Sequence, residues 1–409
     1  MTQRMHPAAA LGPSPAFAEP VVVGKPWTPD RGRLLALIGD VLDSGRLSNG
    51  GPAVTELERR VADLHGVRHC VAVCNGTIAL ELALRAACLT GEVVLPSFTF
   101  VATAHAVRRA GLVPVFADVD PVTHNLDANA VERVITARTS AILGVHLWGR
   151  ACDVAALAGV ARRNGLQLLF DAAHAFGCSH RGRMIGTFGR AEAFSFHATK
   201  FFHTVEGGAV LTDDDEIAES VQRQRNFGFG PSGEALIVGG NAKLNEISAT
   251  VGLSQLDSLE ELAAANRRRY ELYRQGLRDI PGISVVEYSL AERLNYHYLA
   301  VEVDPQETGL DRDALVDILL AENVIARPYF SPPCHLMPAY RGCSTRGLEE
   351  TERLSRRTVA LPTGPAMSAD DIHLVCDIVG AAAELAGRNG GPSGRHADRK
   401  LGRSGSFAS

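Results

Sequence analysis

Short apolar segments recur along the first half of the chain, with amphipathic stretches between them. The strand candidates are residues 69–74, 92–96, 114–118, 141–146, 167–171, 192–196 and 208–212. Continuous apolar runs of this length are typical of strands that are buried on both faces. Their alternation with helical stretches predicts an α/β fold, in which helices cover both faces of a mainly parallel central sheet.

The pattern changes in the second half. From Leu244 to Leu277 the sequence is helical and then strongly charged, which predicts a long helix that joins two domains. Strand candidates at 283–288 and 296–303, followed by a helix near 312–322, predict a smaller C-terminal α+β domain.

The length of 409 residues also indicates two domains, because it exceeds what one typical core accommodates. We expect a large domain over residues 1–256, including the N-terminal segment, and a small domain over 257–386. Residues 387–409 are rich in Gly, Ser and Arg and carry no apolar face, so we expect a disordered tail.

Composition narrows the class of protein. No apolar run is long enough to cross a bilayer, and the N-terminus carries no basic segment followed by an apolar stretch, so neither a membrane span nor a secretory signal is expected. The arginine run at 267–269 is interpreted as a solvated helix face and not as a nucleic-acid site, because the net charge is −5. The eight cysteines form no CxxC pair, which indicates thiols of a cytoplasmic protein and no metal site.

The first candidate for chemistry is Lys200, which closes the run Ala-Phe-Ser-Phe-His-Ala-Thr-Lys. A lysine fixed after a buried strand can be partly desolvated, lose its proton and attack a carbonyl, whereas a lysine on a flexible loop remains a solvated cation. Phenylalanines at 194, 196, 201 and 202 bracket the lysine, so the segment has little reason to be exposed. The pattern therefore favours a functional lysine over an ordinary surface lysine.

Asp171 ends the buried-type strand 167–171, and a carboxylate at a sheet edge is well placed to face a ligand. A capping role in the next turn is the simpler alternative. Pyridoxal phosphate requires both features, because a lysine holds its aldehyde and an acid keeps its ring nitrogen protonated. Lys200 and Asp171 together therefore predict pyridoxal phosphate as the cofactor.

A phosphate site is predicted where the strand 69–74 meets the following helix at Asn75-Gly76-Thr77. The apolar spacing from Ile78 to Leu89 indicates that helix. Glycine lets the backbone approach a ligand closely, the free amides of the first helical turn point at an anion, and a threonine hydroxyl adds a donor. The glycine could also be a simple turn residue. Neither G-x-x-x-x-G-K-[ST] nor G-x-G-x-x-G occurs at this junction.

Seven ordered motifs resemble the DegT/DnrJ/StrS aminotransferases. They are Cys-Asn-Gly-Thr-Ile-Ala-Leu (74–80), Pro-Ser-Phe-Thr-Phe-Val-Ala-Thr (96–103), Asp-Val-Asp-Pro-Val-Thr-His-Asn-Leu-Asp (118–127), Val-His-Leu-Trp-Gly (145–149), Asp-Ala-Ala-His-Ala-Phe-Gly (171–177), Ser-Phe-His-Ala-Thr-Lys (195–200) and Glu-Gly-Gly-Ala-Val (206–210). The resemblance runs from about residue 25 to 385. It implies a fold type I pyridoxal phosphate enzyme, usually a homodimer, which moves an amino group from L-glutamate to a keto sugar carried on a nucleotide.

The resemblance also implies roles for single residues. Lys200 would hold the cofactor, Asp171 would pair with its ring nitrogen, and His174 would lie beside the ring. Gly76, Thr77 and Ser195 match the phosphate contacts, Phe100 matches an aromatic that stacks on the ring, and Asn241 matches an asparagine that reaches the phosphate of the neighbouring subunit.

Some positions depart from the family pattern. Cys74 and Asn75 stand where many relatives have serine, Trp148 stands where tyrosine is common, and Lys243 replaces a frequent arginine. Lysine lacks the forked geometry of arginine, so Lys243 bears most on the partner-subunit contact. His197 fits either a packed histidine or a group near the cofactor.

The loop 326–335 resembles the small-domain loop that faces the sugar nucleotide in relatives. This proline-stiffened loop carries Arg327, Tyr329 and His335, which offer charge and donors for a diphosphate and sugar hydroxyls. The alternative interpretation is a surface loop with incidental polar residues. The motifs around Asp171 and Lys200 look most similar to the subgroup that aminates carbon 4 of dTDP-4-keto-6-deoxyhexoses.

Three functions follow from the sequence. The first is a carbon-4 sugar aminotransferase with two half reactions: glutamate converts pyridoxal phosphate to pyridoxamine phosphate, which then aminates the keto sugar for an amino sugar of a natural product such as an antibiotic, or of a surface glycan. The second is a carbon-3 or cyclitol aminotransferase. The third is a pyridoxal phosphate-binding regulator without turnover, which would need no complete set of lysine, aspartate and phosphate ligands.

Overall fold

The computed structural model describes residues 12, 14–28, 30–343 and 347–389. Its centre is a seven-stranded sheet of order β2-β10-β9-β6-β5-β3-β4. The strands are β2 (His69–Val73), β3 (Glu92–Pro96), β4 (Val113–Ala117), β5 (Thr139–Val145), β6 (Gln167–Asp171), β9 (Glu192–Ser195) and β10 (Gly208–Thr212). The predicted α/β class is confirmed, and β10 alone runs antiparallel to both of its neighbours, so this sheet is mixed.

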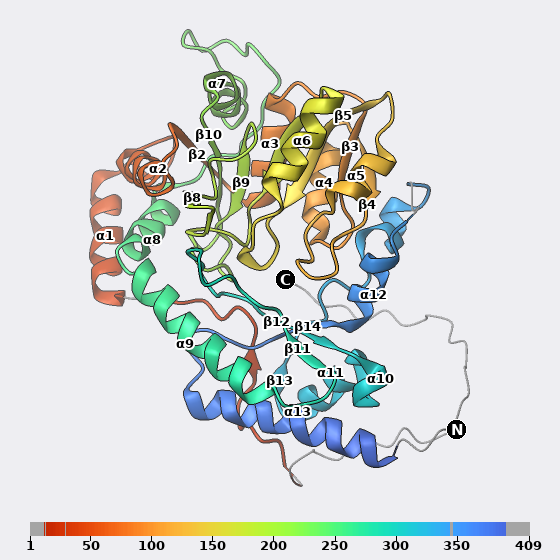
Figure 1. Ribbon diagram of the computed structural model, residues 1–409. Coiled ribbons are helices and arrows are strands. Elements are labelled where there is room, and N and C mark those ends of the chain that lie inside the picture. The colour runs from red at the N-terminus through yellow and green to blue at the C-terminus, as the bar shows by residue number, and fades with distance from the viewer. Residues whose placement is uncertain (1–11, 13, 29, 344–346, 390–409) are drawn as a thin grey trace.

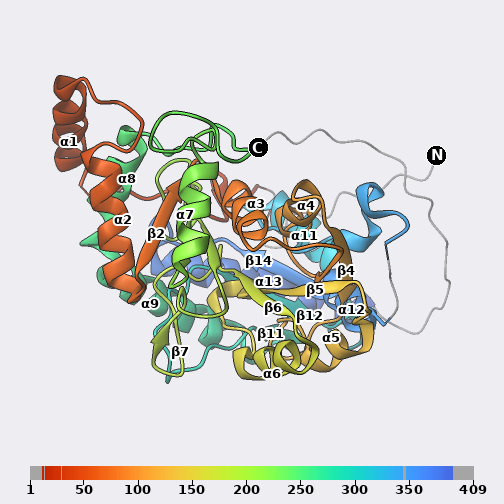
Figure 2. The ribbon, with the colours of Figure 1, turned by 90° about the horizontal axis from the view of Figure 1, so that it is seen from above.

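Helices cover both faces of this sheet (Figures 1 and 2). One face carries α3 (Gly76–Ala86), α4 (Val101–Arg109) and α7 (Asp215–Gln224), and the other carries α2 (Pro52–His65), α5 (Ala128–Val134) and α6 (Val154–Asn164). Side chains alternate between the two cores along each strand: Val93 and Leu95 of β3 belong to one apolar cluster, and Val94 belongs to the other. Two-sided burial explains why these strands are continuous apolar runs.

Helix α3 begins at Gly76, two residues before the start that apolar spacing predicted. The side chain of Asn75 caps it, because Oδ1 accepts the backbone N–H of Ile78 at 2.9 Å. The helix ends at Ala86 and not at Leu89, since Cys88 takes a left-handed φ of 53°. The Asn75 cap therefore places the first turn of α3, with its free N–H groups, directly after β2 in the chain.

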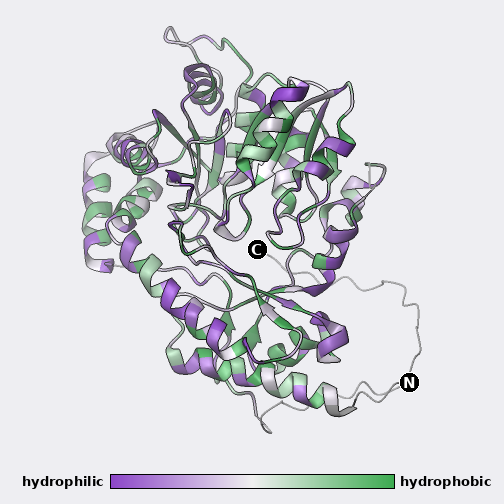
Figure 3. Ribbon diagram, in the orientation of Figure 1, coloured by the Kyte–Doolittle hydropathy of each residue, from purple (hydrophilic) through white to green (hydrophobic). Residues whose placement is uncertain are grey.

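The predicted interdomain helix is two helices, α8 (Glu246–Leu256) and α9 (Leu259–Leu277), which break at Asp257 and Ser258. Figure 1 shows α9 running from the large sheet to a smaller unit. Arg267 and Arg268 lie on the exposed face of α9, in agreement with the solvated face expected for the arginine run. In Figure 3 this helix alternates hydrophilic and hydrophobic turns.

The smaller unit is built on a three-stranded antiparallel sheet of order β11-β12-β14. Its elements are β11 (Ile283–Val285), β12 (Leu299–Val303), α10 (Pro305–Thr308), α11 (Arg312–Ala321), β13 (Val324–Ile325), α12 (Glu349–Arg357), β14 (Thr358–Leu361) and α13 (Ala369–Asn389). The remaining elements are α1 (Arg31–Ser44), β7 (Ser179–His180), β8 (Arg183–Met184) and the 3-10 turns η1 (Leu147–Gly149), η2 (Cys334–Leu336) and η3 (Pro338–Tyr340).

Both ends of the chain depart from the expected boundaries. The strand β1 (Val21–Val22) pairs in parallel with β13, and the N–H of Phe17 donates to the carbonyl of Glu322 at 3.3 Å. Residues 17–22 therefore pack on the smaller unit and not with the large domain to which we assigned them, whereas the carbonyl of Trp27 lies 2.8 Å from His203 Nε2 of the large unit. At the other end, α13 continues through Asn389, so residues 387–389 are helical, and the rest of the predicted tail lies outside the described residues.

Within the residues described, no helix combines the length and the apolar character that a bilayer crossing requires. All eight cysteines are free thiols. No cluster of His, Cys, Asp and Glu in the described part of the chain could hold a metal ion.

The core between α2 and the sheet contains a buried histidine. His65 Nδ1 lies 2.5 Å from the carbonyl oxygen of Ile185, and its ring packs edge-on against Phe176 and Phe194. Burial lowers the pKa of His65 to about 4, although the bond to Ile185 opposes the shift. The side chain is therefore neutral in the folded protein and donates its Nδ1 proton.

We predict that His65 makes the fold acid-sensitive. Its pKa is lower in the folded state than in the unfolded state, so its contribution is complete above pH 6.5 and is lost as the pH falls toward 4, by about 3 kcal/mol in all. His65→Gln keeps a donor for Ile185 but cannot take up a proton. Urea unfolding between pH 7 and 4 should show a shallower loss of stability for this variant, and equal slopes would contradict the assignment.

Candidate active site

Three neighbouring segments meet at the carboxyl edge of the large sheet. Asp171 is the last residue of β6, Ser195 is the last residue of β9, and Gly76 opens α3 directly after β2. These strands run in the same direction, so their ends come together where an open α/β sheet places its ligands.

The turn from β2 into α3 forms a tight cradle with β9 and β10. A Cβ atom added to Gly76 would lie 2.6 Å from Cβ of Ser195, and one added to Gly208 would lie 2.6 Å from the carbonyl carbon of Asn75. Glycine is therefore required at both positions for the backbones to approach this closely. The amides of Gly76 and Thr77 belong to the first turn of α3, where N–H groups have no helical acceptor, so they can bind an anion.

Asp171 is buried, with 5% of its surface exposed, and both of its oxygens are held. Thr103 Oγ1 donates to Oδ2 at 2.8 Å, and the backbone N–H of Ala173 donates to Oδ1 at 3.0 Å. Burial raises the pKa of Asp171, while these two bonds and the charge of Lys200 oppose the rise. The carboxylate is thus fixed in one orientation in a dry environment, where a cationic partner would interact strongly with it.

Lys200 lies in a turn that follows β9 and not on the strand itself. Its backbone N–H donates to the carbonyl of His197 at 2.9 Å, which closes the turn, and its Nζ donates to the hydroxyl oxygen of Tyr298 at 3.1 Å. Burial lowers the pKa of Lys200, and the nearby phenol of Tyr329 and the charge of Asp171 oppose this shift. A desolvated amine of this kind is suited to attack a carbonyl.

His174 is a neutral hydrogen-bond donor at this site. Its Nδ1 accepts the backbone N–H of Trp148 at 3.3 Å, which leaves the proton on Nε2. Burial, and then the charges of Lys200 and His297, hold the pKa of His174 well below its usual value. Its ring packs on Tyr298 with centroids 4.2 Å apart.

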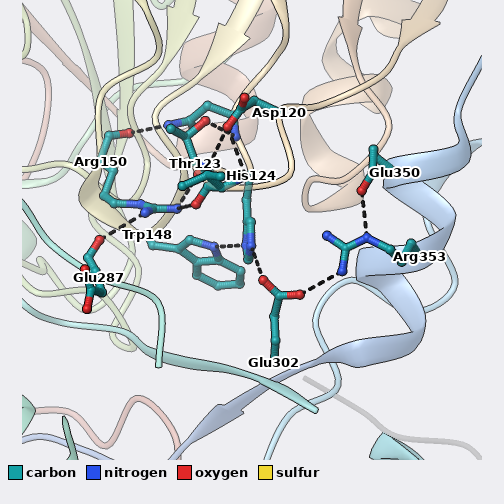
Figure 4. A network of polar contacts seen from close by, with 11 residues as sticks. Asp120, Thr123, His124, Trp148, Arg150, Glu287, Glu302, Glu350 and Arg353 are labelled. Atoms are coloured by element: carbon teal, nitrogen blue, oxygen red, sulfur yellow. Dashed lines mark hydrogen bonds and ion pairs between the residues drawn. The ribbon is translucent and has the colours of Figure 1, made fainter. Parts of the chain in front are cut away.

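Trp148 belongs to a polar network that joins the two units (Figure 4). Its indole Nε1–H donates to His124 Nδ1 at 3.2 Å, and His124 Nε2 lies 2.9 Å from Glu302 of β12. An indole can only donate, so His124 must be the neutral Nε2–H tautomer, and burial accordingly lowers its pKa. Glu302 Oε2 also accepts a hydrogen bond from Nη1 of Arg353 in α12, at 3.1 Å.

Arg150 makes a second connection in the same network. Its guanidinium donates to the carbonyls of Val122 and Thr123 in one unit and to that of Glu287, near β11, in the other (Figure 4). The backbones of Trp148 and His124 both take a left-handed φ of 60°, which is uncommon for residues with a side chain. Two loops of the large unit are thereby held in fixed conformations against the smaller unit.

The other predicted residues lie at the rim. Phe100 precedes α4 and is 59% exposed, less than one helical turn from Thr103. Asn241 is exposed. It lies beside the cradle, because the carbonyl of the next residue, Ala242, accepts the N–H of Cys74 at 2.8 Å. Lys243 Nζ donates to Asn226. The ring of His197 is held by Thr199 at 2.8 Å, close to the turn of Lys200.

The loop 326–335 divides into two parts. Arg327 is exposed, and Tyr329 packs on Phe330 and lies 6.0 Å from Trp148 between ring centroids, so the first part faces the site. His335 is only 5% exposed, and its Nδ1 lies 2.7 Å from Ser97 Oγ. The structure therefore does not bring His335 together with the other predicted residues, and packs it beneath the turn that leads to Phe100.

Thr103, His297 and Tyr298 also belong to the site, although the sequence patterns did not indicate them. Thr103 lies within a quoted motif, but its bond to Asp171 joins positions that are 68 residues apart. His297 Nε2 donates to the carbonyl of Thr199 at 2.8 Å. Both His297 and Tyr298 stand just before β12, where an unusual His-Tyr pair at the start of an apolar strand was the available signal.

The arrangement fits pyridoxal phosphate. The amine of Lys200, the buried carboxylate of Asp171 and the anion cradle at Gly76 occupy one edge of the sheet, and a flat aromatic group, Phe100, is exposed near them. These are the groups that an aldehyde, a ring nitrogen, a phosphate and a ring face require.

Residues 30–380 match the family model of the DegT/DnrJ/EryC1/StrS aminotransferase family. The chain is 34% identical to dTDP-4-amino-4,6-dideoxy-D-glucose transaminase of Shigella dysenteriae over 88% of this chain and 98% of that protein. It is 36% identical to GDP-perosamine synthase of Caulobacter vibrioides over 82% and 91% of the two chains. The crystal structure of DesI in the presence of its TDP-sugar product is 48% identical, with a TM-score of 0.89 over 93% of this chain and 98% of that one.

We predict that the indole N–H of Trp148 stabilises the fold through His124. Trp148→Phe keeps an aromatic ring but leaves the buried Nδ1 of His124 without a donor, which should lower the free energy of unfolding by about 1–3 kcal/mol. In a His124→Leu background the same change should cost less, because no acceptor remains. Urea unfolding of the four proteins measures the difference, and equal costs in both backgrounds would contradict the role of the bond.

Proposed function

The chain belongs to the DegT/DnrJ/EryC1/StrS family and is a pyridoxal phosphate-dependent sugar aminotransferase of fold type I, and we propose that it aminates carbon 4 of a nucleotide-linked 4-keto-6-deoxyhexose. The site in which Lys200, Asp171 and the Gly76 cradle share one sheet edge supports the aminotransferase reaction, and the names of the relatives support carbon 4. A regulator without turnover is set aside, because the family is one of aminotransferases.

Two relatives support carbon 4 and a dTDP carrier. The Shigella dysenteriae and Escherichia coli proteins, 34% and 32% identical, are both named dTDP-4-amino-4,6-dideoxy-D-glucose transaminase. The name of GDP-perosamine synthase points to a different nucleotide at similar identity, so we propose dTDP on the likeness to DesI with its TDP-sugar product. An amino sugar for a natural product such as an antibiotic, or for a surface glycan, would be the use of the product.

The residues of the edge divide the work of catalysis. When bound, pyridoxal phosphate supplies an electron sink and carries the amino group between the two substrates. The amides of Gly76 and Thr77, with Ser195, would hold its phosphate, and Asp171 would keep its ring nitrogen protonated. We propose that Lys200 holds its aldehyde and moves protons at Nζ in each half reaction.

The rim would shape the remaining contacts. Phe100 offers a flat apolar face to the ring, and His174 offers its Nε2–H as a donor beside it. Arg327 and Tyr329 are proposed to face the sugar nucleotide, and Arg327 is exposed as a diphosphate ligand must be. His335 is better placed to hold the Ser97 turn beneath Phe100 than to touch the substrate.

L-Glutamate is the proposed amino donor, and pyridoxamine phosphate is the form of the cofactor between the half reactions. A cytoplasmic location remains the prediction made from the sequence. A carbon-3 keto sugar or a cyclitol remains the alternative acceptor, and the choice is a matter for the experiment below.

We also propose a homodimer with shared sites. None of the residues of α1 is buried, and two of its apolar side chains, Leu35 and Leu42, are more than half exposed. Val238, close to Asn241, is 83% exposed. Apolar surface of this kind is typical of a surface that another chain covers, and Asn241 would then reach the phosphate of the partner's cofactor.

The proposed substrate is tested by product analysis. The enzyme is incubated with L-glutamate and, separately, with dTDP- and GDP-linked 4-keto-6-deoxyhexoses, a dTDP-linked 3-keto-6-deoxyhexose and a keto cyclitol. We expect mass spectrometry and NMR to find a carbon-4 amino sugar from the dTDP-4-keto substrate, and no product with Lys200→Ala. Preference for the 3-keto sugar or the cyclitol would replace the carbon-4 proposal, and preference for the GDP sugar would replace the nucleotide.

Subunit exchange tests the shared site. If Asn241 serves the partner's phosphate, a heterodimer of Lys200→Ala and Asn241→Ala chains has both lesions in one site and one intact site. Its activity per undamaged lysine should exceed that of the Asn241→Ala homodimer. Asn241→Ala alone should weaken cofactor retention roughly ten- to a hundredfold, as expected for loss of a hydrogen bond to a charged phosphate. No gain in verified heterodimers, with Asn241→Ala clearly impaired, would place Asn241 in its own chain's site.

A further inference from the structure

Tyr298 is the residue that contacts the amine of Lys200. Its hydroxyl oxygen lies 3.1 Å from Nζ, and the centre of its ring lies 5.8 Å from the same atom. Among the described residues, this hydroxyl is the only group that forms a hydrogen bond with Nζ. Asp171, which also stabilises the charged amine, acts on it through space and not through a direct bond.

The phenol is held in this position from several sides. The side chain of Tyr298 is 7% exposed, and its ring packs on His174 at 4.2 Å and edge-on against Trp148 at 5.6 Å between centroids. The hydroxyl of Tyr288 lies 2.8 Å from the carbonyl oxygen of Tyr298 and 3.0 Å from that of Trp148. The backbone that carries Tyr298 is therefore tied to the backbone of the wall beside it.

A hydroxyl suits an amine that changes its protonation state. A protonated Lys200 donates a hydrogen bond to the phenol oxygen, whereas a neutral Lys200 can accept a hydrogen bond from the phenol O–H, because a tyrosine hydroxyl is both donor and acceptor. The bond from the ammonium is the stronger of the two, since one partner is charged. Burial, and then the charge of Asp171, raise the pKa of Tyr298 well above its usual value, so the phenol keeps its own proton.

We propose that Tyr298 is a further catalytic residue, whose hydroxyl binds Nζ of Lys200 whenever that amine is free and keeps it within reach of the reacting atoms. Tyr298 acts as a hydrogen-bond partner and gives up no proton in this role. The inference rests on the assignment of Lys200 as the reacting amine, which was proposed above. Tyr298 comes from the segment just before β12, so the smaller unit would supply a group to the reaction itself.

The test is the reactivity of Lys200 in the protein saturated with pyridoxamine phosphate, a state in which the lysine is not bound to the cofactor. Lysines are labelled with formaldehyde and borohydride-type reductant over a range of pH, and peptide mass spectrometry follows each site. The chain has only four lysines, Lys25, Lys200, Lys243 and Lys400. Exposed Lys25 provides an internal reference for the reagent.

Only the neutral amine reacts, so the pH at which Lys200 labelling begins follows its pKa. The phenol of Tyr298 stabilises the ammonium more than the amine, so Tyr298→Phe should lower this pKa. Labelling of Lys200 should then begin at a lower pH than in the wild type, while labelling of Lys25 stays unchanged. An unchanged onset at Lys200 would overturn the proposal.

Tyr270→Phe is the matched control. It removes a buried hydroxyl that lies near the carbonyl of Val286 in the same smaller unit, and its ring contacts neither Tyr298 nor Nζ, so it should leave the onset of Lys200 labelling where it is. Thermal unfolding of both variants verifies that they are folded. An equal shift in the two variants would show that Tyr298 acts only through packing, and would overturn the proposal.

Kinetics supply a second readout. Tyr298→Phe should lower kcat about ten- to a hundredfold, the usual weight of a hydrogen bond to a charged group, and should leave KM for the keto sugar nearly unchanged. A rise in KM at constant kcat would assign Tyr298 to substrate binding and overturn the inference. Borohydride reduction of the wild-type holoenzyme tests the role of Lys200 separately. A reduced cofactor adduct on another lysine would show that Lys200 is not the reacting amine, whereas the labelling experiment tests the hydrogen bond to Tyr298.

Discussion

The site depends on a short segment of the smaller unit, residues 295–298, which contacts the turns at the edge of the large sheet. Asn295 Nδ2 donates to the carbonyls of His174 and Phe176, and His297 Nε2 donates to the carbonyl of Thr199. Tyr298 then contacts the amine of Lys200. The turns that carry His174 and Lys200 are thus fixed from outside the sheet, and neither the strands nor the helices alone would determine where these side chains point.

Buried histidines make this junction sensitive to charge. His297 has its pKa lowered to about 4, mainly by burial, and His124 and His174 are lowered for the same reason. Each one holds a defined tautomer because its partner can only donate or only accept. Neutral rings therefore act as directional connectors between loops. The arrangement avoids further positive charge beside an amine that must be able to lose its proton.

Sequence patterns predicted the large sheet well. Its strands are buried on both faces, and local apolar runs report this directly, as for β6 and β10. The residues at strand ends, such as Asp171 and Gly76, could be found because strand, turn and helix signals place them at one edge. The direction of β10 and the break between α8 and α9 escaped prediction, since both depend on pairing and packing with distant residues. The same limit applies to Tyr298 and Thr103, which join the site through contacts across 98 and 68 residues.

The parallel pairing of β1 with β13 has a consequence for protein engineering. Because residues 17–22 complete the unit formed by the last third of the chain, that unit is not one contiguous stretch of sequence. A chimera that takes the residues after Asp257 from a relative would still carry β1 of this chain. Phe17 and Val21 would then pack against a surface from another protein, with which they did not evolve. Exchange of acceptor specificity by recombination therefore needs two crossover points, one before α1 and one between α8 and α9.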